Sequence, residues 1–327
     1  RRISVLLILA VVLLPFTGCT TKPATQSRTG YYFNTMVTLT LFTGGSQAAL
    51  DGAFELCAGY EKLFSRTDPD SALYALNHAD GRAVAIDPEL ETVLRTACAW
   101  AERTGGRFDP TVAPLSDLWD FGNGGRLPAA EEIAAALPCV GYQNVVFSDG
   151  CVCLQNGAEV DLGGIAKGYI GDRLREYLEE AGVTSGLIDL GGNIFCIGEK
   201  DGGRPFSVGI KNPENTADLS AVVEVSGQSV ATSGGYERCF TADGVTYHHI
   251  LDPATGMPAE SDLASATVIC AEGAQADLLS TICFLYGRAE ALTLIESLPD
   301  TEAVFITVDG EIVYTSGTGE NGIPITI

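Results

Sequence analysis

The chain has 327 residues, and its 42 acidic against 19 basic side chains give a formal net charge of −23 at pH 7. This balance, with no basic run after residue 18, argues against nucleic acid as a partner. An acidic protein also repels phosphate at long range, so any phosphate site here needs a bound cation or a placed lysine.

Residues 1–18 form a predicted lipoprotein signal peptide. Two arginines precede an apolar run from Ile3 to Phe16, which is shorter than the ~20 residues that span a bilayer. The Thr-Gly-Cys sequence ending at Cys19 resembles a lipobox, which predicts that Cys19 is lipidated and begins the mature chain. Secretion after cleavage at another site is the alternative. We therefore expect a lipid anchor in the cell membrane and a protein on its extracytoplasmic face.

Residues 19–30 are polar and unpatterned, which predicts a flexible tether. Residues 31–327 are the predicted folded part. Their length, about 300 residues, is enough for one large domain or two closely packed ones. We find no repeat and no clear linker, so we treat 31–327 as one domain.

Apolar residues at three- and four-residue steps predict amphipathic helices. The first begins after Ser46 and runs to Phe64, and the second begins at Asp87-Pro88 and stops before Gly105-Gly106. Further helices are expected at 128–138, 164–181 and 274–286.

Turn sequences centred on Asp-Gly predict antiparallel hairpins. The paired strands are expected at 143–147 and 151–155, at 238–241 and 245–250, and at 303–308 and 311–316. The helices do not alternate regularly with strands, so the predicted class is α+β, with mixed antiparallel sheets and packed helices.

The stretch VDLGGIAKGY at 160–169 is typical of an anion site. Asp161 ends a short apolar run, Gly163 and Gly164 make a turn, and Lys167 stands at the start of a helix, whose unpaired N–H groups attract anions. Neither the Walker A pattern nor the dinucleotide pattern fits. The alternative is a strand-to-helix turn in which the glycines serve only close packing.

Asp277 and Thr281 lie four residues apart in a predicted helix, which puts a carboxylate and a hydroxyl on one face. This is half of a Mg²⁺ site, which a turn carbonyl, water and a substrate phosphate would complete. The alternative is an ordinary polar helix face.

Adjacent histidines in a predicted strand face opposite ways, so Tyr247 and His249 should share one face and His248 should take the other. One histidine would then serve a site and the other would face solvent. His249 is a candidate general base because its charge is adjustable near neutral pH. A purely structural histidine is the alternative.

Together these stretches resemble the FAD:protein FMN transferases, the ApbE family. The motifs that carry the resemblance occur in order at 104–122, 160–169, 188–194, 230–240, 247–259 and 276–281. The resemblance extends from about residue 34 to the C-terminus and implies an ApbE-like architecture related to the T-fold. It also implies Mg²⁺-dependent transfer of the FMN moiety of FAD to a Thr or Ser hydroxyl of a target protein, with release of AMP. The implied partner is an acceptor flavoprotein with a motif like D-x-x-T/S-G-A-T/S.

The resemblance also assigns roles to residues. The positions that bind FAD in the family correspond to Met36, Thr67, Arg107, Phe108, Asp109, Asp161, Lys167 and Leu251. The metal ligands correspond to Gly164, through its carbonyl, and to Asp277, Ser280 and Thr281. The base is His249 or Asp277. Two alternatives share the same pocket: a Mg²⁺-dependent FAD pyrophosphatase that yields FMN and AMP, and a non-catalytic FAD-binding lipoprotein.

Overall fold

The computed structural model describes residues 25–320 and 322–327. The predicted signal peptide, Cys19 and residues 19–24 of the predicted tether lie outside the described residues. Within the described part, no helix combines the length and the apolar character needed to cross a membrane.

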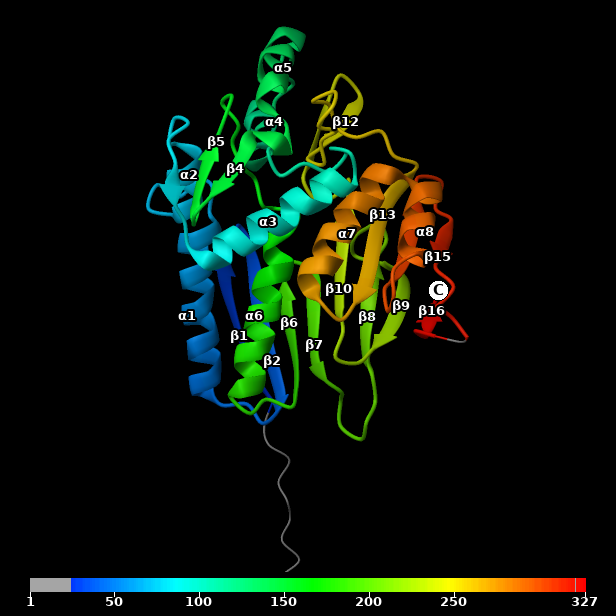
Figure 1. The fold of residues 1–327 in the computed structure, drawn as a ribbon. Coiled ribbons are helices and arrows are strands. Elements are labelled where there is room, and N and C mark those ends of the chain that lie inside the picture. The colour runs from blue at the N-terminus through cyan, green and yellow to red at the C-terminus, as the bar shows by residue number, and fades with distance from the viewer. Residues whose placement is uncertain (1–24, 321) are drawn as a thin grey trace, which may run out of the picture.

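An antiparallel sheet of eight strands, whose spatial order differs from their order in the chain, forms the centre of the structure (Figure 1). Its strands, in spatial order, are β1 (Gln26–Tyr32), β2 (Thr35–Thr43), β6 (Ser185–Leu190), β7 (Asn193–Gly198), β10 (Ser229–Gly234), β13 (Leu263–Cys270), β14 (Glu302–Thr307) and β15 (Ile312–Tyr314). Strands distant in sequence, such as β2 and β6, are therefore neighbours.

Helices cover one face of this sheet (Figure 1). They are α1 (Gln47–Phe64), α6 (Ala166–Glu180), α7 (Gly273–Tyr286) and α8 (Arg288–Glu296), with α3 (Pro88–Arg103) lying across them. The residues buried between sheet and helices form the main hydrophobic core, which includes Leu39, Leu174 and Leu278. This core fixes α6 and α7 against the sheet.

The other face of the sheet is covered by a three-stranded sheet in the order β16 (Ile325–Thr326), β9 (Leu219–Val225) and β8 (Phe206–Lys211). A second buried cluster joins the two sheets and includes Phe206, Val223 and Ile269. Over β7, β10, β13 and β14 the central sheet is therefore apolar on both faces.

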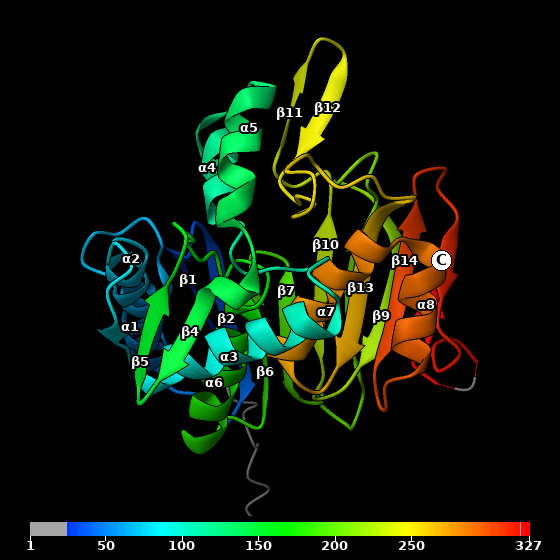
Figure 2. The same cartoon turned by 45° about the horizontal axis from the view of Figure 1, so that its top comes forward.

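Smaller elements stand at one end of the central sheet. One group consists of α2 (Ala72–Asn77) and the sheet of β3 (Val84–Ala85), β5 (Cys151–Leu154) and β4 (Val145–Ser148). The other consists of α4 (Ala113–Trp119), α5 (Ala130–Ala136) and the hairpin of β11 (Cys239–Ala242) and β12 (Val245–His248), which project side by side (Figure 2). Trp119 joins them, because it packs on Phe240 and Tyr247 and donates a hydrogen bond to the Gly256 carbonyl at 2.8 Å.

The predicted α+β class is confirmed, and so are the hairpins β4–β5, β11–β12 and β14–β15. The predicted N-caps are also confirmed. Ser46 accepts the Ala49 N–H at 3.1 Å, and Asp87 accepts the Glu89 N–H at 2.8 Å. The helix expected at 128–138 is shorter, because a 3₁₀ turn that contains Pro138 follows α5.

The predicted end of the tether is wrong for residues 26–30. These residues form most of β1, which pairs in register with β2. The sequence looked unpatterned because this strand is polar, yet its hydroxyls pair across the sheet, as between Thr29 and Thr38 at 3.0 Å. Arg28 and Gly30 also contact the Phe54 ring of α1. Cross-strand pairing thus makes an ordered strand from polar residues.

Candidate active site

The glycine turn before α6 lies against α7. A Cβ built on Gly164 would lie 3.2 Å from a ring carbon of Phe108 and 3.4 Å from the Thr281 Oγ1. Asp161 shapes the turn by accepting the Gly163 N–H at 2.8 Å. The structure therefore brings together Phe108, Gly164 and Thr281, which lie far apart in the sequence.

Asp277 is the buried carboxylate of this site and is only 3 % exposed. Its Oδ2 accepts the Gly168 N–H at 2.9 Å, and its Oδ1 accepts the Asn193 side-chain amide at 2.8 Å. Lys167 Nζ lies 3.8 Å from the same Oδ1. A buried carboxylate is costly unless it is hydrogen-bonded, and here these groups supply that compensation.

Hydroxyl groups gather along α7 in the turn after Asp277. Ser233 on β10 lies with its Oγ 2.8 Å from the Ser280 Oγ and 3.0 Å from the Thr281 Oγ1. Ser280 is completely buried and also donates to the Asp277 carbonyl at 2.8 Å. The predicted ligand positions on α7 are therefore joined to β10 by Ser233.

The oxygens available here on α7 are hard donors, the Asp277 carboxylate and the Thr281 hydroxyl, and the Gly164 turn lies against Thr281. Among residues 25–320 and 322–327, no three His, Cys, Asp or Glu side chains lie close enough to hold a metal. Mg²⁺ needs few carboxylates, because it keeps several waters and binds substrate phosphates. Each carboxylate oxygen of Asp277 also retains a second acceptor position beyond the bond described. The donor set therefore fits Mg²⁺.

His249 lies directly after β12, and its backbone N–H donates to the Arg238 carbonyl at 3.0 Å. Burial lowers its pKa to about 3, with smaller contributions from the positive charges of Arg238 and Lys167. The imidazole is therefore neutral at neutral pH. Its Nδ1 is buried and has no hydrogen-bond partner among the described residues.

The prediction that one histidine would face solvent is wrong. His248 is half-buried, and its ring stands edge-on to Phe284 with the centroids 5.3 Å apart. Burial also lowers the pKa of His248. Because β12 ends at His248, strand alternation does not extend to His249.

Asp161 makes an ion pair with Arg66, whose Nε lies 3.0 Å from Oδ2. The same guanidinium lies 2.6 Å from Asp117 on α4. Thr67, the neighbour of Arg66, is exposed. Arg66 thus connects the end of α1 to the glycine turn.

Other predicted FAD positions lie apart from Asp277. Arg107 is exposed, pairs with Glu290 and stacks over the Tyr286 ring at 4.2 Å. Leu251 is buried in the cluster around Trp119. Met36 is 54 % exposed at the end of β2 that meets the turn at Gly191.

The carboxylate of Asp109 accepts hydrogen bonds from nearby loop residues. It accepts the N–H and hydroxyl of Thr111 at 2.9 and 2.6 Å and the N–H of Tyr142 at 2.8 Å. Burial raises the pKa of this carboxyl group, against the effect of those bonds. These contacts give the Asp109 side chain a role in shaping the loop.

Several contacts of the site were missed from the sequence. Asn193 and Ser233 fall inside the motifs at 188–194 and 230–240, which were the available signal. Arg66 had no such signal. Its importance follows from contacts with residues more than fifty positions away.

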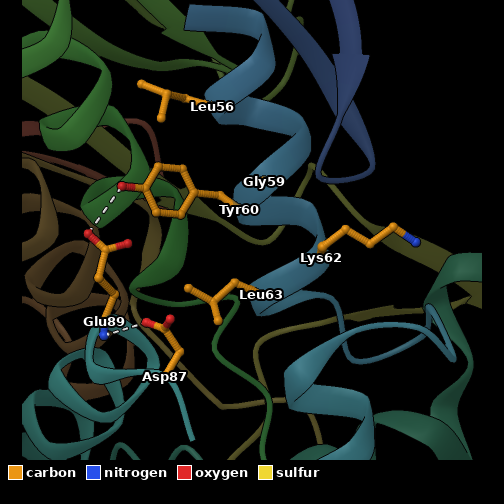
Figure 3. Close-up of a pocket in the computed structure, with 7 residues that line it drawn as sticks. All are labelled: Leu56, Gly59, Tyr60, Lys62, Leu63, Asp87 and Glu89. Atoms are coloured by element: carbon orange, nitrogen blue, oxygen red, sulfur yellow. Dashed lines mark hydrogen bonds between the residues drawn. The ribbon is translucent and has the colours of Figure 1, made fainter.

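One cavity of about 470 Å³ lies elsewhere, between α1 and the start of α3 (Figure 3). Tyr60 donates to Glu89 at 3.3 Å within it, and none of the predicted site residues lines it. A smaller cavity of about 160 Å³ is lined by Asp109, Tyr142, Pro253 and Ala254, among others. This one joins the loop before α4 to the turn at 252–256.

Comparison with known proteins places this chain and its architecture in one family. Residues 33–305 match the model of the ApbE family. The crystal structure of the ApbE protein from Thermotoga maritima superposes with a TM-score of 0.83 at 34 % identity, covering 90 % of this chain and 97 % of that one. The chain therefore belongs to the ApbE family.

Relatives with assigned names agree. The chain is 36 % identical to the FAD:protein FMN transferase of Treponema pallidum, over 83 % of this chain and 80 % of that protein. It is 35 % identical to the FAD:protein FMN transferase of Klebsiella pneumoniae, over 83 % and 85 %. The flavinyl transferase ApbE of Pseudomonas stutzeri has a TM-score of 0.79 at 28 % identity, with 90 % and 95 % covered. The named homologues of this chain are thus transferases.

Proposed function

We propose that this protein is a Mg²⁺-dependent FAD:protein FMN transferase. It moves the FMN moiety of FAD to a Thr or Ser hydroxyl of a target flavoprotein and releases AMP. The observation that carries the proposal is the convergence of Asp277, Thr281 and the Gly164 turn beside Lys167. The names of the relatives support FAD as the substrate, and this convergence supports the proposal that its phosphates bind here.

Lys167 supplies the local positive charge that a phosphate site needs in a strongly acidic chain. Its ammonium group is partly exposed and lies at the edge of the buried carboxylate, where a phosphate oxygen can reach it. Together with Arg238 it places positive charge beside His249. Bound Mg²⁺ would be held by Asp277, Thr281 and the Gly164 carbonyl, and it would offset charge on the phosphoryl oxygens and the AMP leaving group.

His249 is better placed than Asp277 to act as the base. In the proposed complex the remaining acceptor positions of Asp277 would bind Mg²⁺, whereas Nδ1 of the neutral His249 ring has no partner among the described residues. The phosphates of FAD would offset the nearby charges of Lys167 and Arg238, which raises the pKa of His249 in the complex.

The proposed reaction forms one bond to phosphorus and breaks one. The acceptor oxygen forms a bond to the phosphorus on the riboflavin side, and the pyrophosphate bond to AMP breaks. The hydroxyl proton passes to His249. The acceptor keeps FMN through a phosphoester.

The membrane anchor and the acceptor motif are further parts of the proposal. Lipidation at Cys19 would hold the enzyme on the extracytoplasmic face of the cell membrane. The acceptor would present its hydroxyl in a segment like D-x-x-T/S-G-A-T/S. The support for both is the sequence pattern and the family resemblance.

The test is incubation with FAD and Mg²⁺, with and without an acceptor that carries the motif, followed by chromatography of FMN and AMP. We expect AMP in amounts that match the acceptor, with little free FMN. Equal free FMN and AMP without acceptor would instead identify a pyrophosphatase. Bound FAD without either product would identify a flavin-binding lipoprotein.

A further inference from the structure

Neither helix of the site caps its own N-terminus. No side chain of the N-cap residue bonds the first turn of α6 or of α7, where the residues concerned are Ile165 and Glu272. The first N–H groups of a helix have no partner within the helix, so buried helix starts need acceptors from elsewhere. In this structure each helix supplies an acceptor to the other.

Asp172 of α6 provides the cap for α7. Its carboxylate accepts the Gly273 N–H at 2.8 Å and the Ala274 N–H at 2.9 Å. In return Asp277 of α7 accepts the Gly168 N–H of α6 at 2.9 Å. The starts of the two helices are thus joined by reciprocal carboxylate caps, and Figure 1 shows α6 and α7 as neighbours on the sheet.

Close backbone contact leaves little freedom at this crossing. A Cβ on Gly168 would lie 2.2 Å from the Gly273 carbonyl oxygen, and a Cβ on Gly273 would lie 2.1 Å from the Phe195 ring. Only glycine permits such an approach. The caps therefore act between helices that are already in direct contact.

Arg175 extends the arrangement to Ala271, two residues before α7. Its guanidinium donates to Asp172 and to the Ala271 carbonyl, both at 2.8 Å, and to the Ser229 Oγ on β10 at 3.3 Å. Asp172 is buried, and a buried negative charge needs compensation. This arginine and the two N–H groups supply it. The start of α7 is fixed to both α6 and β10.

We propose that Asp172 is a positioning residue for the metal site. By capping α7 one turn before Asp277, it sets the Asp277 and Thr281 face of that helix against the Gly164 turn. The inference rests on the proposed function, because it concerns the Mg²⁺ that function requires. Asp172 itself does not touch substrate or metal.

The test measures metal affinity directly. Mn²⁺ is titrated into the protein with FAD present and acceptor absent, and free Mn²⁺ is followed by electron paramagnetic resonance. Asp172→Asn keeps the size of the side chain but turns an amide group toward one of the N–H donors. We expect its Kd for Mn²⁺ to rise about 10-fold, the lower end for loss of supporting contacts around a metal site. FAD affinity should stay within about twofold and, at saturating Mg²⁺, kcat within about threefold, by the same reasoning.

Glu296→Gln is the matched control. Glu296 is also a carboxylate that accepts a backbone N–H, that of Ser316 at 2.7 Å, but it lies at the end of α8 and contacts none of the site residues. We expect wild-type Mn²⁺ binding from this variant. If Asp172→Asn lowers the unfolding temperature yet binds Mn²⁺ like the wild type, Asp172 is only structural and the inference is overturned.

Failure of the proposed function and misfolding of the variant can each be told apart from failure of the inference. A wild-type protein that binds FAD but no Mn²⁺ overturns the metal part of the proposed function and the inference with it. If Asp172→Asn does not fold, Arg175→Gln carries the test, because it leaves the Asp172 carboxylate at the start of α7 but removes the guanidinium that holds it. About threefold weaker Mn²⁺ binding is then expected, and unchanged binding overturns the inference.

Discussion

The Gly168 N–H donates to Asp277 Oδ2 at 2.9 Å, which ties the first turn of one helix to the buried carboxylate of another. Lys167, the preceding residue, stands on the same turn, 3.8 Å from the other carboxylate oxygen. The glycine turn and the acidic helix are therefore one site, built from segments 109 residues apart.

Gly168→Ala tests how close these helices must be. The added methyl group would lie 2.2 Å from the Gly273 carbonyl oxygen and 2.7 Å from the Asp277 Cβ, so the helices must separate. We expect a loss of about 1–3 kcal/mol in the free energy of unfolding, as in other overpacked cores, together with lower activity. Gly59→Ala is the control, because nothing lies within 4 Å of its added carbon. Equal stability of both variants would contradict the prediction.

Asp277→Ala should abolish AMP release. Removing the charged ligand from a cation held by few protein groups leaves too little to bind it. FAD binding should survive at reduced affinity, because the adenine and isoalloxazine rings would still contact the protein. Fluorescence titration with FAD and chromatography of AMP measure the two effects separately. Wild-type turnover by Asp277→Ala would end the assignment.

His249→Ala should slow FMN transfer by about 10²- to 10⁴-fold, the usual cost of losing a positioned base. Metal binding should be unchanged, since His249 is not among the oxygen donors. The comparison requires transfer rates at saturating FAD and a Mn²⁺ titration of both proteins. A variant that transfers at the wild-type rate would exclude His249 as the base.

The low pKa of His249 also predicts how stability depends on pH. The pKa is about 3 in the folded protein and 6.5 ordinarily, so the unfolded chain binds this proton more tightly. The contribution of neutral His249 is complete above pH 6.5 and is lost as the pH falls toward 3. His249→Gln should therefore lose stability less steeply than the wild type in this window, by at most about 1.4 kcal/mol per pH unit. Parallel curves from chemical unfolding at several pH values would contradict this.

Asp109→Ala separates a structural role from a role in FAD binding. The change leaves the N–H groups of Thr111 and Tyr142 without their acceptor. We expect unfolding to become easier by about 1–3 kcal/mol per unsatisfied buried group. Thermal unfolding without FAD measures this cost. An unchanged unfolding temperature with weakened FAD binding would instead favour direct contact with the flavin.

Local signals in the sequence predicted five of the eight α-helices in the described residues and three of the hairpins, but not the hairpins β1–β2, β6–β7 and β8–β9. Ser46 and Asp87-Pro88 mark helix starts through bonds to residues two or three positions away, so neighbouring residues suffice to read them. The spacing of Asp277 and Thr281 likewise follows from helix geometry alone.

Contacts between distant segments could not be read in this way. Asp172 meets Gly273 across 101 residues, and Arg66 meets Asp117 across 51. The polar strand β1 was missed for the same reason, because its order depends on pairing with β2. Strand alternation placed one of the two histidines toward solvent, whereas packing against Phe284 leaves His248 half-buried.

Transfer of FMN to protein is measured most directly by intact mass spectrometry of an acceptor that carries the motif, after incubation with this enzyme, FAD and Mg²⁺. EDTA and an acceptor whose target Thr is changed to Ala are the controls. The account predicts a mass increase equal to one FMN moiety, absent from both controls and greatly slowed with His249→Ala. An acceptor of unchanged mass, with free FMN and AMP accumulating in solution, would contradict it.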